Sequence, residues 1–487
     1  MKYKSLALNA FLNSIRNILG ILFPIITFPY ISRRLSVEGI GIYNFSNSIV
    51  SYFVLIAALG ISTYAIREGA KYRDNKEKIT QFSSEVFTIN VFSTLIAYLL
   101  LFGCLVIFPK LHNYVVCILI FSLQIFFATI GTEWIYQIYE DYTYITIRSI
   151  VFQIISIILL FIFVKNPTDY LNYAAITVFS AVGSNIFNFM HARQYCHIHL
   201  VFHFNWKKHI IPILTLFAVS IASVIYINSD VTLLGIMKNN YVVGVYSVSS
   251  KIYQMVKTLI SALLIVTVPR LAMLFGKKQF KEYKIILSKV TNSLVVLTLP
   301  ASVGLFMLAK EVVIIISGER FLRSVSSLRI LTFAYIFSLL AYILSDCVLI
   351  PAKREKYILR NTFISAVLNV AFNIICIPFF AENAAAVSTI LAEICIFVTN
   401  YFSASDLIQD VFKTRTFMWN FISSVIGCFG IVLVCIFSDV EYSSLILKTV
   451  LSIVLSVIIY PVILILLKNK VALNVVKNIR YIFSKRS

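Results

Sequence analysis

The chain has 487 residues, of which 60% are hydrophobic and only 13% are charged, and its mean hydropathy is +0.90. This composition excludes a soluble protein with a solvated surface and predicts an all-α integral membrane protein with the lipid bilayer as its partner. The 42 Lys and Arg outnumber the 21 Asp and Glu. Because these basic residues fall between apolar runs and not on one soluble face, we expect no nucleic-acid partner.

Apolar runs long enough to cross a bilayer recur about fourteen times along the chain. They cover residues 10–32, 41–64, 82–108, 113–136, 145–164, 171–190, 210–235, 242–268, 289–309, 327–350, 358–379, 384–403, 416–438 and 444–467. Basic clusters lie between alternate runs, at 67–78, 270–289, 353–360 and 468–486. Since cytoplasmic loops carry the excess of Lys and Arg, both termini are predicted to be cytoplasmic.

The run that begins at Asn240 carries two lysines inside an apolar span, Lys251 and Lys257. Polar residues recur there every three or four positions, which places them on one helical face: Ser247, Ser250, Gln254, Thr258 and Ser261. Lys257 lies about eleven residues, or roughly 16 Å, before the end of the run, which is too deep for its ammonium group to reach water easily. An intramembrane ammonium group faces a bundle interior or a wet cavity. We therefore expect a cationic lumen through which something anionic moves.

The first run carries a polar stripe that includes Asn13, Arg16 and Asn17. These side chains are predicted to face the same interior as the lysine-bearing run. Arg16 has two interpretations, because it lies about 9 Å into the span: it lines the lumen, or it extends to the cytoplasmic interface.

A short internal repeat links the second and eighth runs. The sequence Gly41-Ile42-Tyr43-x-Phe45-Ser46-x-Ser48-Ile49 resembles Gly244-Val245-Tyr246-x-Val248-Ser249-x-Lys251-Ile252, which lies 203 positions later. Two halves of similar topology with a substrate site between them are a common transporter plan. We expect six-helix bundles at 1–205 and 206–405 around a central cationic cavity, with two additional helices and a basic tail at 406–487. Ser48 is the counterpart of Lys251 and is expected to line the lumen together with Gln254.

Two acidic residues within spans are candidates for ion coupling or ion pairing. Asp230 lies near the outer end of the seventh run and is a candidate partner of Lys251. Glu393 lies in the middle of the twelfth run, where it either carries a coupling proton or pairs with a basic neighbour. Coupling to H⁺ or Na⁺ therefore stays open.

No cofactor and no enzyme activity are expected from the remaining motifs. The chain has no GxxxxGK[ST], GxSxG or HExxH sequence. The loop at 191–209 holds five histidines, and His199 and His203 have the spacing of a metal pair. Because no further ligand completes a known spacing, a solvated loop is the favoured interpretation, and we expect no metal.

Several motifs resemble those of the bacterial polysaccharide-repeat-unit flippases, within the multidrug/oligosaccharidyl-lipid/polysaccharide exporter superfamily. The resemblance rests on Pro29-Tyr30-Ile31-Ser32-Arg33-Arg34-Leu35 with Glu38-Gly39-x-Gly41-Ile42-Tyr43, on Glu133-Trp134-x-Tyr136-Gln137-x-x-Glu140-Asp141-Tyr142-x-Tyr144-Ile145, on Gly318-Glu319-x-Phe321, on Ile350-Pro351-Ala352, and on Asn369-x-x-x-Asn373 through Pro378 to Glu393. Two features of the family are absent: a basic residue in the second helix and a glycine near 381–383.

The resemblance implies a transporter with two six-helix bundles and two additional helices that alternates between inward-open and outward-open forms. It implies a substrate, undecaprenyl-diphosphate-linked oligosaccharide, that moves from the cytoplasmic to the outer leaflet of the bacterial cytoplasmic (inner) membrane for O-antigen or capsule synthesis. It also implies diphosphate contacts for Arg16, Lys251 and Lys257, and a polysaccharide polymerase and a chain-length regulator as partners. Two alternatives remain: a multidrug or other small-molecule exporter of the same superfamily, and a membrane polysaccharide polymerase.

Overall fold

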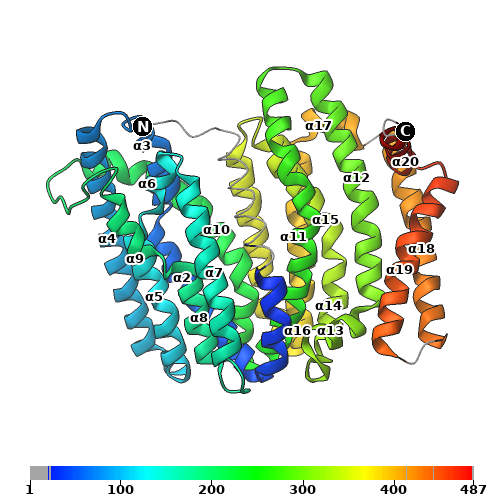
Figure 1. Ribbon diagram of the computed structural model, residues 1–487, viewed down its shortest axis with the longest axis horizontal. Coiled ribbons are helices and arrows are strands. Elements are labelled where there is room, and N and C mark those ends of the chain that lie inside the picture. The colour runs from blue at the N-terminus through cyan, green and yellow to red at the C-terminus, as the bar shows by residue number, and fades with distance from the viewer. Residues whose placement is uncertain (1–19, 21–22, 413, 442–443, 485–487) are drawn as a thin grey trace. The chain divides into compact units, whose positions relative to one another are not determined.

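The computed structural model describes residues 20, 23–412, 414–441 and 444–484, and these residues form helices joined by turns, without strands. The chain divides into two compact units, Met1–Ser247 and Val248–Ser487 (Figure 1). The division falls inside the helix that carries both lysines. Each unit is described by itself below, and the six-helix bundles at 1–205 and 206–405 remain a prediction.

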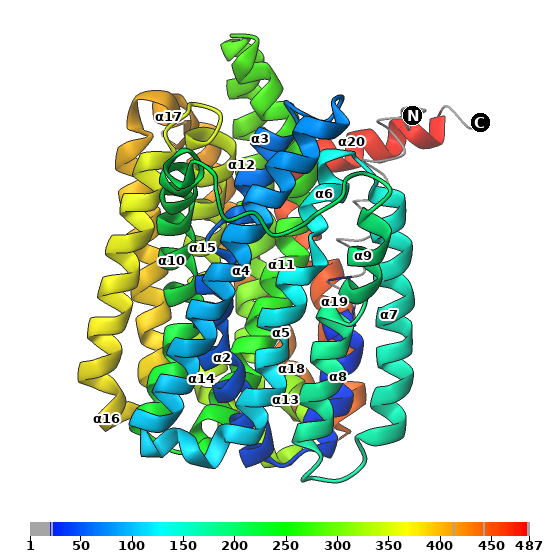
Figure 2. The same ribbon diagram turned by 90° about the vertical axis from the view of Figure 1, so that its left-hand side faces the viewer.

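Unit 1 is a bundle of long helices that run side by side (Figure 2). After a helical segment at 23–34, its elements are α2 (Val37–Ala58), α3 (Ile61–Gly69), α4 (Lys76–Ile107), η1 (Pro109–Tyr114), α5 (Val115–Gly131), α6 (Glu133–Ile138), α7 (Tyr142–Phe163), α8 (Tyr170–Val182), α9 (Asn185–Ala192), α10 (Trp206–Met237) and the first residues of α11 (Asn240–Gly276). Side-chain caps start several of them. Ser36 accepts a hydrogen bond from the backbone N–H of Gly39 at the start of α2, and Asn75 caps α4 in the same way.

Unit 2 contains the rest of α11 and a second set of long helices. Its elements are α12 (Phe280–Met307), α13 (Ala309–Ser317), η2 (Glu319–Phe321), α14 (Ser324–Thr332), α15 (Ala334–Tyr342), the π-helical turn η3 (Ile343–Leu349), α16 (Glu355–Ser403), α17 (Ser405–Phe412), α18 (Arg415–Glu441), α19 (Leu445–Leu466) and α20 (Lys470–Ser484). Its largest apolar core gathers side chains of α11, α12, α15, η3 and α17.

The helix α16 is a hairpin of two helices. A straight helix of 49 residues would be about 74 Å long, more than twice the thickness of the hydrocarbon layer. The chain leaves helical geometry at Ala381 (φ 47°, ψ −125°). Side chains then pair across the two arms: Ser365 donates to the carbonyl of Ala392, Asn369 lies 3.2 Å from Ser388, and Asn361 lies 2.9 Å from Asn400. The sequence predicted these arms as two separate spans.

Replacing Ala381 by Gly should stabilise the protein. Ala381 has a positive φ that L-residues adopt at a cost of about 1–3 kcal/mol, and glycine adopts it freely. We expect the thermal unfolding midpoint of the purified protein to rise. Ala384→Gly is the matched control, because Ala384 is buried in the helical arm that follows, where glycine costs about 1 kcal/mol. A lower unfolding midpoint for Ala381→Gly would contradict the interpretation that the positive φ of Ala381 destabilises the protein.

The exposed surface of both units is apolar. Leu99, Val106, Phe379 and Leu466 are each more than 70% exposed, as expected of side chains in contact with lipid. Among the described residues, ten helices are long and apolar enough to cross a membrane, and twelve if each of two bent helix pairs is one span. The chain is therefore a multi-pass, all-helical membrane protein. A total of fourteen spans remains a prediction, because most of the first apolar run lies outside the described residues.

The two glycines that open the internal repeat meet at one helix crossing in unit 1. A Cβ atom on Gly41 would lie 1.8 Å from the carbonyl oxygen of Asn240, and one on Gly244 would lie 2.0 Å from the carbonyl oxygen of Val37. Asn240 follows Val37 by the same 203 positions that separate the two glycines. Swapping each residue for its counterpart in the repeat turns the Gly41–Asn240 contact into the Gly244–Val37 contact. A local two-fold axis between α2 and α11 requires this relation. This reciprocity supports the repeat independently of its sequence match.

Candidate functional site

Lys257 stands inside α11 and forms an ion pair. The helix runs from Asn240 to Gly276 and bends by 49° between its parts Asn240–Ala262 and Thr267–Gly276, so Lys257 lies five residues before the end of the first part. The Nζ atom of Lys257 donates a hydrogen bond of 2.8 Å to Oε1 of Glu393 on α16. The sequence left two roles open for Glu393, and the structure shows it paired with a basic neighbour. The lysine is therefore not an isolated cation in the part of the chain that the structure describes.

The two members of this pair differ in exposure. The side chain of Glu393 is 6% exposed, whereas that of Lys257 is 32% exposed. Glu393 is therefore embedded in unit 2, while the ammonium group keeps one side open. Tyr253 lies one turn before Lys257 with its ring 5.8 Å from Nζ, and it packs against Tyr335 with ring centroids 4.6 Å apart. These aromatic rings hold the lysine stem in place while the charged end remains reachable.

The other predicted polar residues of α11 lie on a partly open face. Lys251 is half-buried, and it makes no ion pair with the residues that the structure describes. Gln254 is exposed. Thr258 and Ser261 donate to backbone carbonyls of their own helix, at 2.7 and 3.0 Å. The predicted polar face is therefore buried at Ser247 and partly open from Ser250 onward.

The remaining predicted residues fall in unit 1 or outside the described chain. Arg16, Asn13 and Asn17 lie outside the described residues, and their roles stay predictions. Ser48 is buried: its Oγ accepts a hydrogen bond from Thr232 on α10 and donates to the carbonyl of Phe45. Asp230, also buried, accepts a hydrogen bond of 2.6 Å from the hydroxyl of Tyr246. Asp230 and Lys251 belong to different units, so their pairing remains a prediction.

Sequence reasoning missed a polar row on α2. Asn44, Asn47 and Ser51 are each half-buried and follow one another at helical spacing. Adding 203 to their numbers gives Ser247, Ser250 and Gln254, which belong to the polar face of α11. The internal repeat was therefore the signal that could have identified them. The polar row of α2 has no cation beside it. The position of α2 that corresponds to Lys251 of α11 is Ser48.

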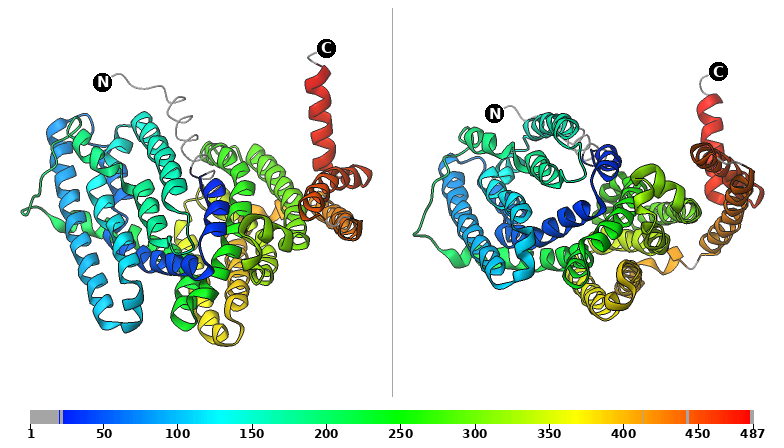
Figure 3. Two further views of the ribbon diagram at one scale, coloured as in Figure 1. Left: turned by 60° about the horizontal axis from the view of Figure 1, so that its bottom comes forward. Right: turned by 90° about the horizontal axis from the view of Figure 1, so that it is seen from below.

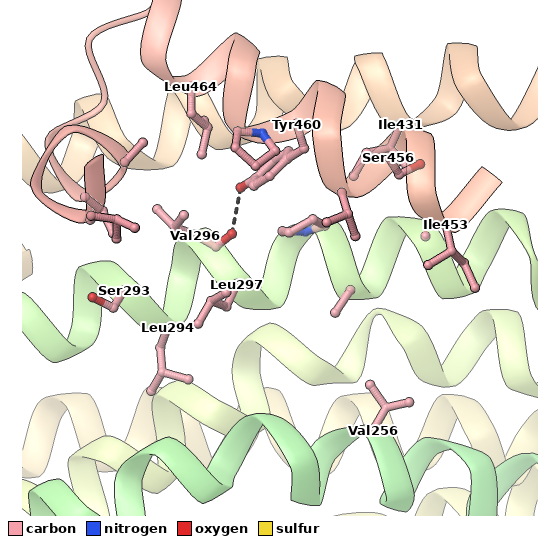
Figure 4. A pocket seen from close by; sticks show the side chains of 18 of the residues that line it. Val256, Ser293, Leu294, Val296, Leu297, Ile431, Ile453, Ser456, Tyr460 and Leu464 are labelled. Atoms are coloured by element: carbon pink, nitrogen blue, oxygen red, sulfur yellow. Dashed lines mark hydrogen bonds between the residues drawn. The ribbon is translucent and has the colours of Figure 1, made fainter. Parts of the chain in front are cut away.

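Unit 2 also contains a large apolar groove (Figure 4). Its volume is about 980 Å³, and residues of α11, α12, α13, α18, α19 and α20 line it. Apolar side chains such as Leu294, Leu297 and Ile453 make up most of its walls. Tyr460 closes part of one wall by donating a 2.7 Å hydrogen bond to the carbonyl of Val296. The two helices predicted to be additional, α18 and α19, thus build a surface suited to an aliphatic chain.

The histidine-rich loop is tied into unit 1 by hydrogen bonds. Among the described residues, no three His, Cys, Asp or Glu side chains are placed to hold a metal ion. His199 lies 3.3 Å from the hydroxyl of Ser84 on α4. His209 is buried between the hydroxyl of Tyr64 and the carboxylate of Glu85, at 2.8 Å from each. Glu85 therefore has hydrogen-bond partners inside unit 1.

The loop that joins α15–η3 to α16 is held by an ion pair outside the spans. Arg354 donates to both carboxylate oxygens of Asp406, at 2.7 and 2.6 Å. Hydrogen bonding from Arg354 lowers the pKa of the Asp406 carboxyl group. This pair ties the residue that precedes α16 to α17.

The motifs that carried the family resemblance have structural roles in unit 1. Tyr136 is fully buried and donates to the carbonyl of Asn188 at 2.6 Å. Asp141 caps α7 and accepts a 2.7 Å hydrogen bond from Tyr195, and Glu140 pairs with Arg73 at 3.1 Å. These residues fasten α6, α7 and the loop after α9 together. These contacts support the fold of unit 1, whereas the last of the motifs, which runs from Asn369 to Glu393, lies in unit 2 and ends at the partner of Lys257.

Two curated relatives resemble this sequence. A putative O-antigen transporter of Escherichia coli (strain K12) is 28% identical over 148 residues, which cover 30% of this chain and 36% of that protein. A putative O-antigen transporter of Shigella dysenteriae is 22% identical over 379 residues, which cover 77% of this chain and 94% of that protein.

Two solved structures share the fold. The lipid II flippase MurJ in an inward closed conformation matches with a TM-score of 0.69 at 16% identity, covering 94% of this chain and 99% of that one. A MATE structure in complex with MaL6 matches with a TM-score of 0.51 at 14% identity, covering 84% and 96%. At these identities the likeness concerns the fold alone.

The family comparison agrees with the motifs found in the sequence. Residues 6–275 match the model of the family described as polysaccharide biosynthesis protein. This match covers more than half of the chain, including α2, the motif at 133–145 and the Lys257 helix. The chain therefore belongs to the polysaccharide biosynthesis protein family.

Proposed function

We propose that this protein is a transporter, and not an enzyme, that flips undecaprenyl-diphosphate-linked oligosaccharide repeat units from the cytoplasmic to the outer leaflet for O-antigen or capsule synthesis. The observation that carries the proposal is the partly exposed, charged side chain of Lys257 inside the bent helix pair that forms a candidate membrane span. An intramembrane charge of this kind marks a substrate or ion path. A diphosphate is the part of such a lipid that cannot cross the hydrocarbon layer without a cation.

The Lys257–Glu393 pair supplies a way to bind and release the diphosphate. A lysine about 4 Å from a phosphate gains about 1–4 kcal/mol in a polar protein environment. Glu393 competes for the same ammonium group, so a bound phosphate must displace it. When the substrate leaves, the carboxylate recovers the ammonium group, and the cost of a buried Glu393 carboxylate without its partner therefore favours release of the phosphate. Lys251 and Arg16 are proposed to share the diphosphate with Lys257, and Gln254, Ser48, Asn13 and Asn17 to line its path.

The apolar groove of unit 2 is proposed to hold part of the prenyl tail. The tail is aliphatic, and because it already lies in the hydrocarbon layer it gains from close packing against an apolar wall and not from leaving water. The groove has that character over most of its lining. Holding the tail there would keep one end of the substrate in place while the diphosphate and the sugars move.

The remaining parts of the proposal follow from topology and charge. We place the protein in the bacterial inner membrane with both termini in the cytoplasm, because its basic clusters lie at alternate loops. A central cationic cavity between six-helix bundles at 1–205 and 206–405 is part of the proposal. An inside-negative potential favours outward movement of an anion, and exchange of H⁺ or Na⁺ at Glu393 or Asp230 is a second source of energy. A polysaccharide polymerase and a chain-length regulator are the proposed partners.

Deleting the gene should leave undecaprenyl-linked repeat units facing the cytoplasm. Lipid-linked sugars would be extracted from intact and from permeabilised cells after treatment with a sugar-modifying enzyme that does not cross the membrane. We expect the repeat units of the deletion strain to be protected in intact cells only, and complementation by the native chain to abolish that protection. Repeat units that are modified equally in both preparations of the deletion strain would overturn the proposal.

A further inference from the structure

The last helix, α20, departs from the direction of the spans. α18 and α19 run alongside one another, whereas α20 lies across their ends and projects beyond them (Figures 2 and 3). Two asparagines build this turn. Asn469 is buried, and its Oδ1 accepts hydrogen bonds from the backbone N–H groups of Val471 and Ala472, at 2.9 and 3.2 Å. Oδ1 of Asn420 on α18 accepts from the N–H of Lys470. The orientation of α20 is therefore fixed by specific contacts.

The sequence of α20 is amphipathic and basic. Apolar residues recur at 472, 475, 476, 479, 482 and 483, which places them on one face of a helix. Lysine or arginine stands at 468, 470, 477, 480, 485 and 486, and no acidic residue follows Glu441 in the chain. A helix with one apolar face, one cationic face and an axis across the spans has the features of a helix that lies in the interfacial layer of a membrane.

The first part of the apolar face contacts protein. Val471, Ala472, Val475 and Val476 line the apolar groove, so this half of α20 closes one end of the groove. Val475 nevertheless remains 53% exposed and Leu473 41% exposed. Lys289 on α12 lines the same groove and is exposed, which adds a positive charge beside α20.

We propose that α20 docks on anionic phospholipid headgroups, with its apolar face against the acyl chains and its lysines and arginine among the phosphates. Charge complementarity selects this occupant. Each basic residue close to an anionic leaflet contributes about fivefold to membrane binding, and the uniformly cationic face of α20 carries no opposing charge. Docking holds α20 at the end of the groove and so positions the groove relative to the leaflet. The inference rests on α20 itself and does not require the proposed transport function.

Hydrogen exchange of the full-length protein in nanodiscs tests the proposal without any substrate. We compare nanodiscs of pure phosphatidylcholine with nanodiscs of equal parts phosphatidylcholine and phosphatidylglycerol. The backbone amides of residues 471–484 should exchange about tenfold more slowly in the anionic discs. High salt should reduce the difference, because it screens exposed charges. Amides of α18 and α19 should exchange equally in both and serve as the internal reference.

Charge reversal on α20 should remove this lipid dependence. The double variant Lys477→Glu/Arg480→Glu is expected to exchange equally fast in both kinds of disc. Lys281→Glu is the matched control, because Lys281 is an exposed lysine on α12 outside α20, and it should keep the difference. Equal exchange of the native chain in both discs would overturn the proposal, and so would an unchanged lipid dependence in the double variant.

Discussion

Removing both charges of the Lys257–Glu393 pair should abolish most transport while leaving the protein folded. In the double variant Lys257→Met/Glu393→Gln, the diphosphate loses an attraction of about 1–4 kcal/mol. This loss corresponds to a drop of about fivefold to several hundredfold in affinity. The readout is the flux of an undecaprenyl-diphosphate-linked sugar into proteoliposomes, together with the affinity of the purified protein for undecaprenyl diphosphate.

The double variant is more informative than Lys257→Ala. Glu393 is 6% exposed, and deleting its partner alone leaves a buried carboxylate uncompensated, at a cost of about 3–5 kcal/mol. A loss of flux in Lys257→Ala would therefore mix lost binding with lost stability. Neutralising both members removes that charge.

Glu393→Gln by itself should have the opposite effect on binding. It leaves the ammonium group of Lys257 without its competing carboxylate, so we expect tighter binding of undecaprenyl diphosphate and slower release. If the pair were only structural, this single variant would bind undecaprenyl diphosphate no more tightly than the native chain, and the double variant would transport normally.

A second lysine–glutamate pair of unit 2 provides the matched control. Lys448 on α19 lies 2.6 Å from Glu311 on α13, and their side chains are 14% and 9% exposed. Lys448 also pairs with Asp439, whose side chain is 68% exposed, so the double variant Lys448→Met/Glu311→Gln neutralises the buried pair and leaves only a solvent-exposed carboxylate without its partner. We expect it to alter the unfolding midpoint by an amount similar to that of the α11–α16 double variant and to leave flux unchanged. Equal loss of flux in the two double variants would contradict a binding role for Lys257.

The fold was largely predictable because apolar runs of span length leave few alternatives. Their positions correspond to the observed helices. The sequence predicted the two arms of α16 as separate spans, and in the structure they are continuous except for the break at Ala381. The break at Ala381 could not be found from periodicity, because alanine favours the helix interior. The resemblance gave the only hint, since it leads one to expect a glycine near this position.

The candidate site was only partly predictable. The depth of Lys257 in its span identified it as unusual, and the position of Glu393 left a basic partner open. Lys257 and Glu393 are 136 positions apart in the chain and belong to different helices. No local sequence pattern encodes such a contact. The row Asn44, Asn47 and Ser51 was missed for a different reason: small polar residues within an apolar span give a weak signal until the repeat aligns them with α11.

Adding a methyl group to Gly41 or Gly244 should open the crossing of α2 and α11. The new Cβ atoms would lie 1.8 and 2.0 Å from backbone carbonyl oxygens, and no side-chain rotation relieves a collision with backbone. The helices must separate, which breaks the packing around them. We expect Gly41→Ala and Gly244→Ala each to destabilise the protein by about 1–3 kcal/mol, as measured by the thermal unfolding midpoint.

Gly103→Ala is the control for this pair. Gly103 lies inside α4, and a Cβ atom there meets no heavy atom within 4 Å. Alanine should therefore stabilise that helix by up to about 1 kcal/mol. A destabilisation at Gly41 or Gly244 no larger than the effect at Gly103 would contradict the close crossing.

Combining the two glycine substitutions tests whether they act at one place. Once the first methyl group has separated α2 from α11, the second enters space that is already open, so the double variant should lose less stability than the sum of the single variants. Two sites that behave independently would give additive losses. Sub-additive losses would show that Gly41 and Gly244, which occupy equivalent positions of the repeat, hold one shared contact.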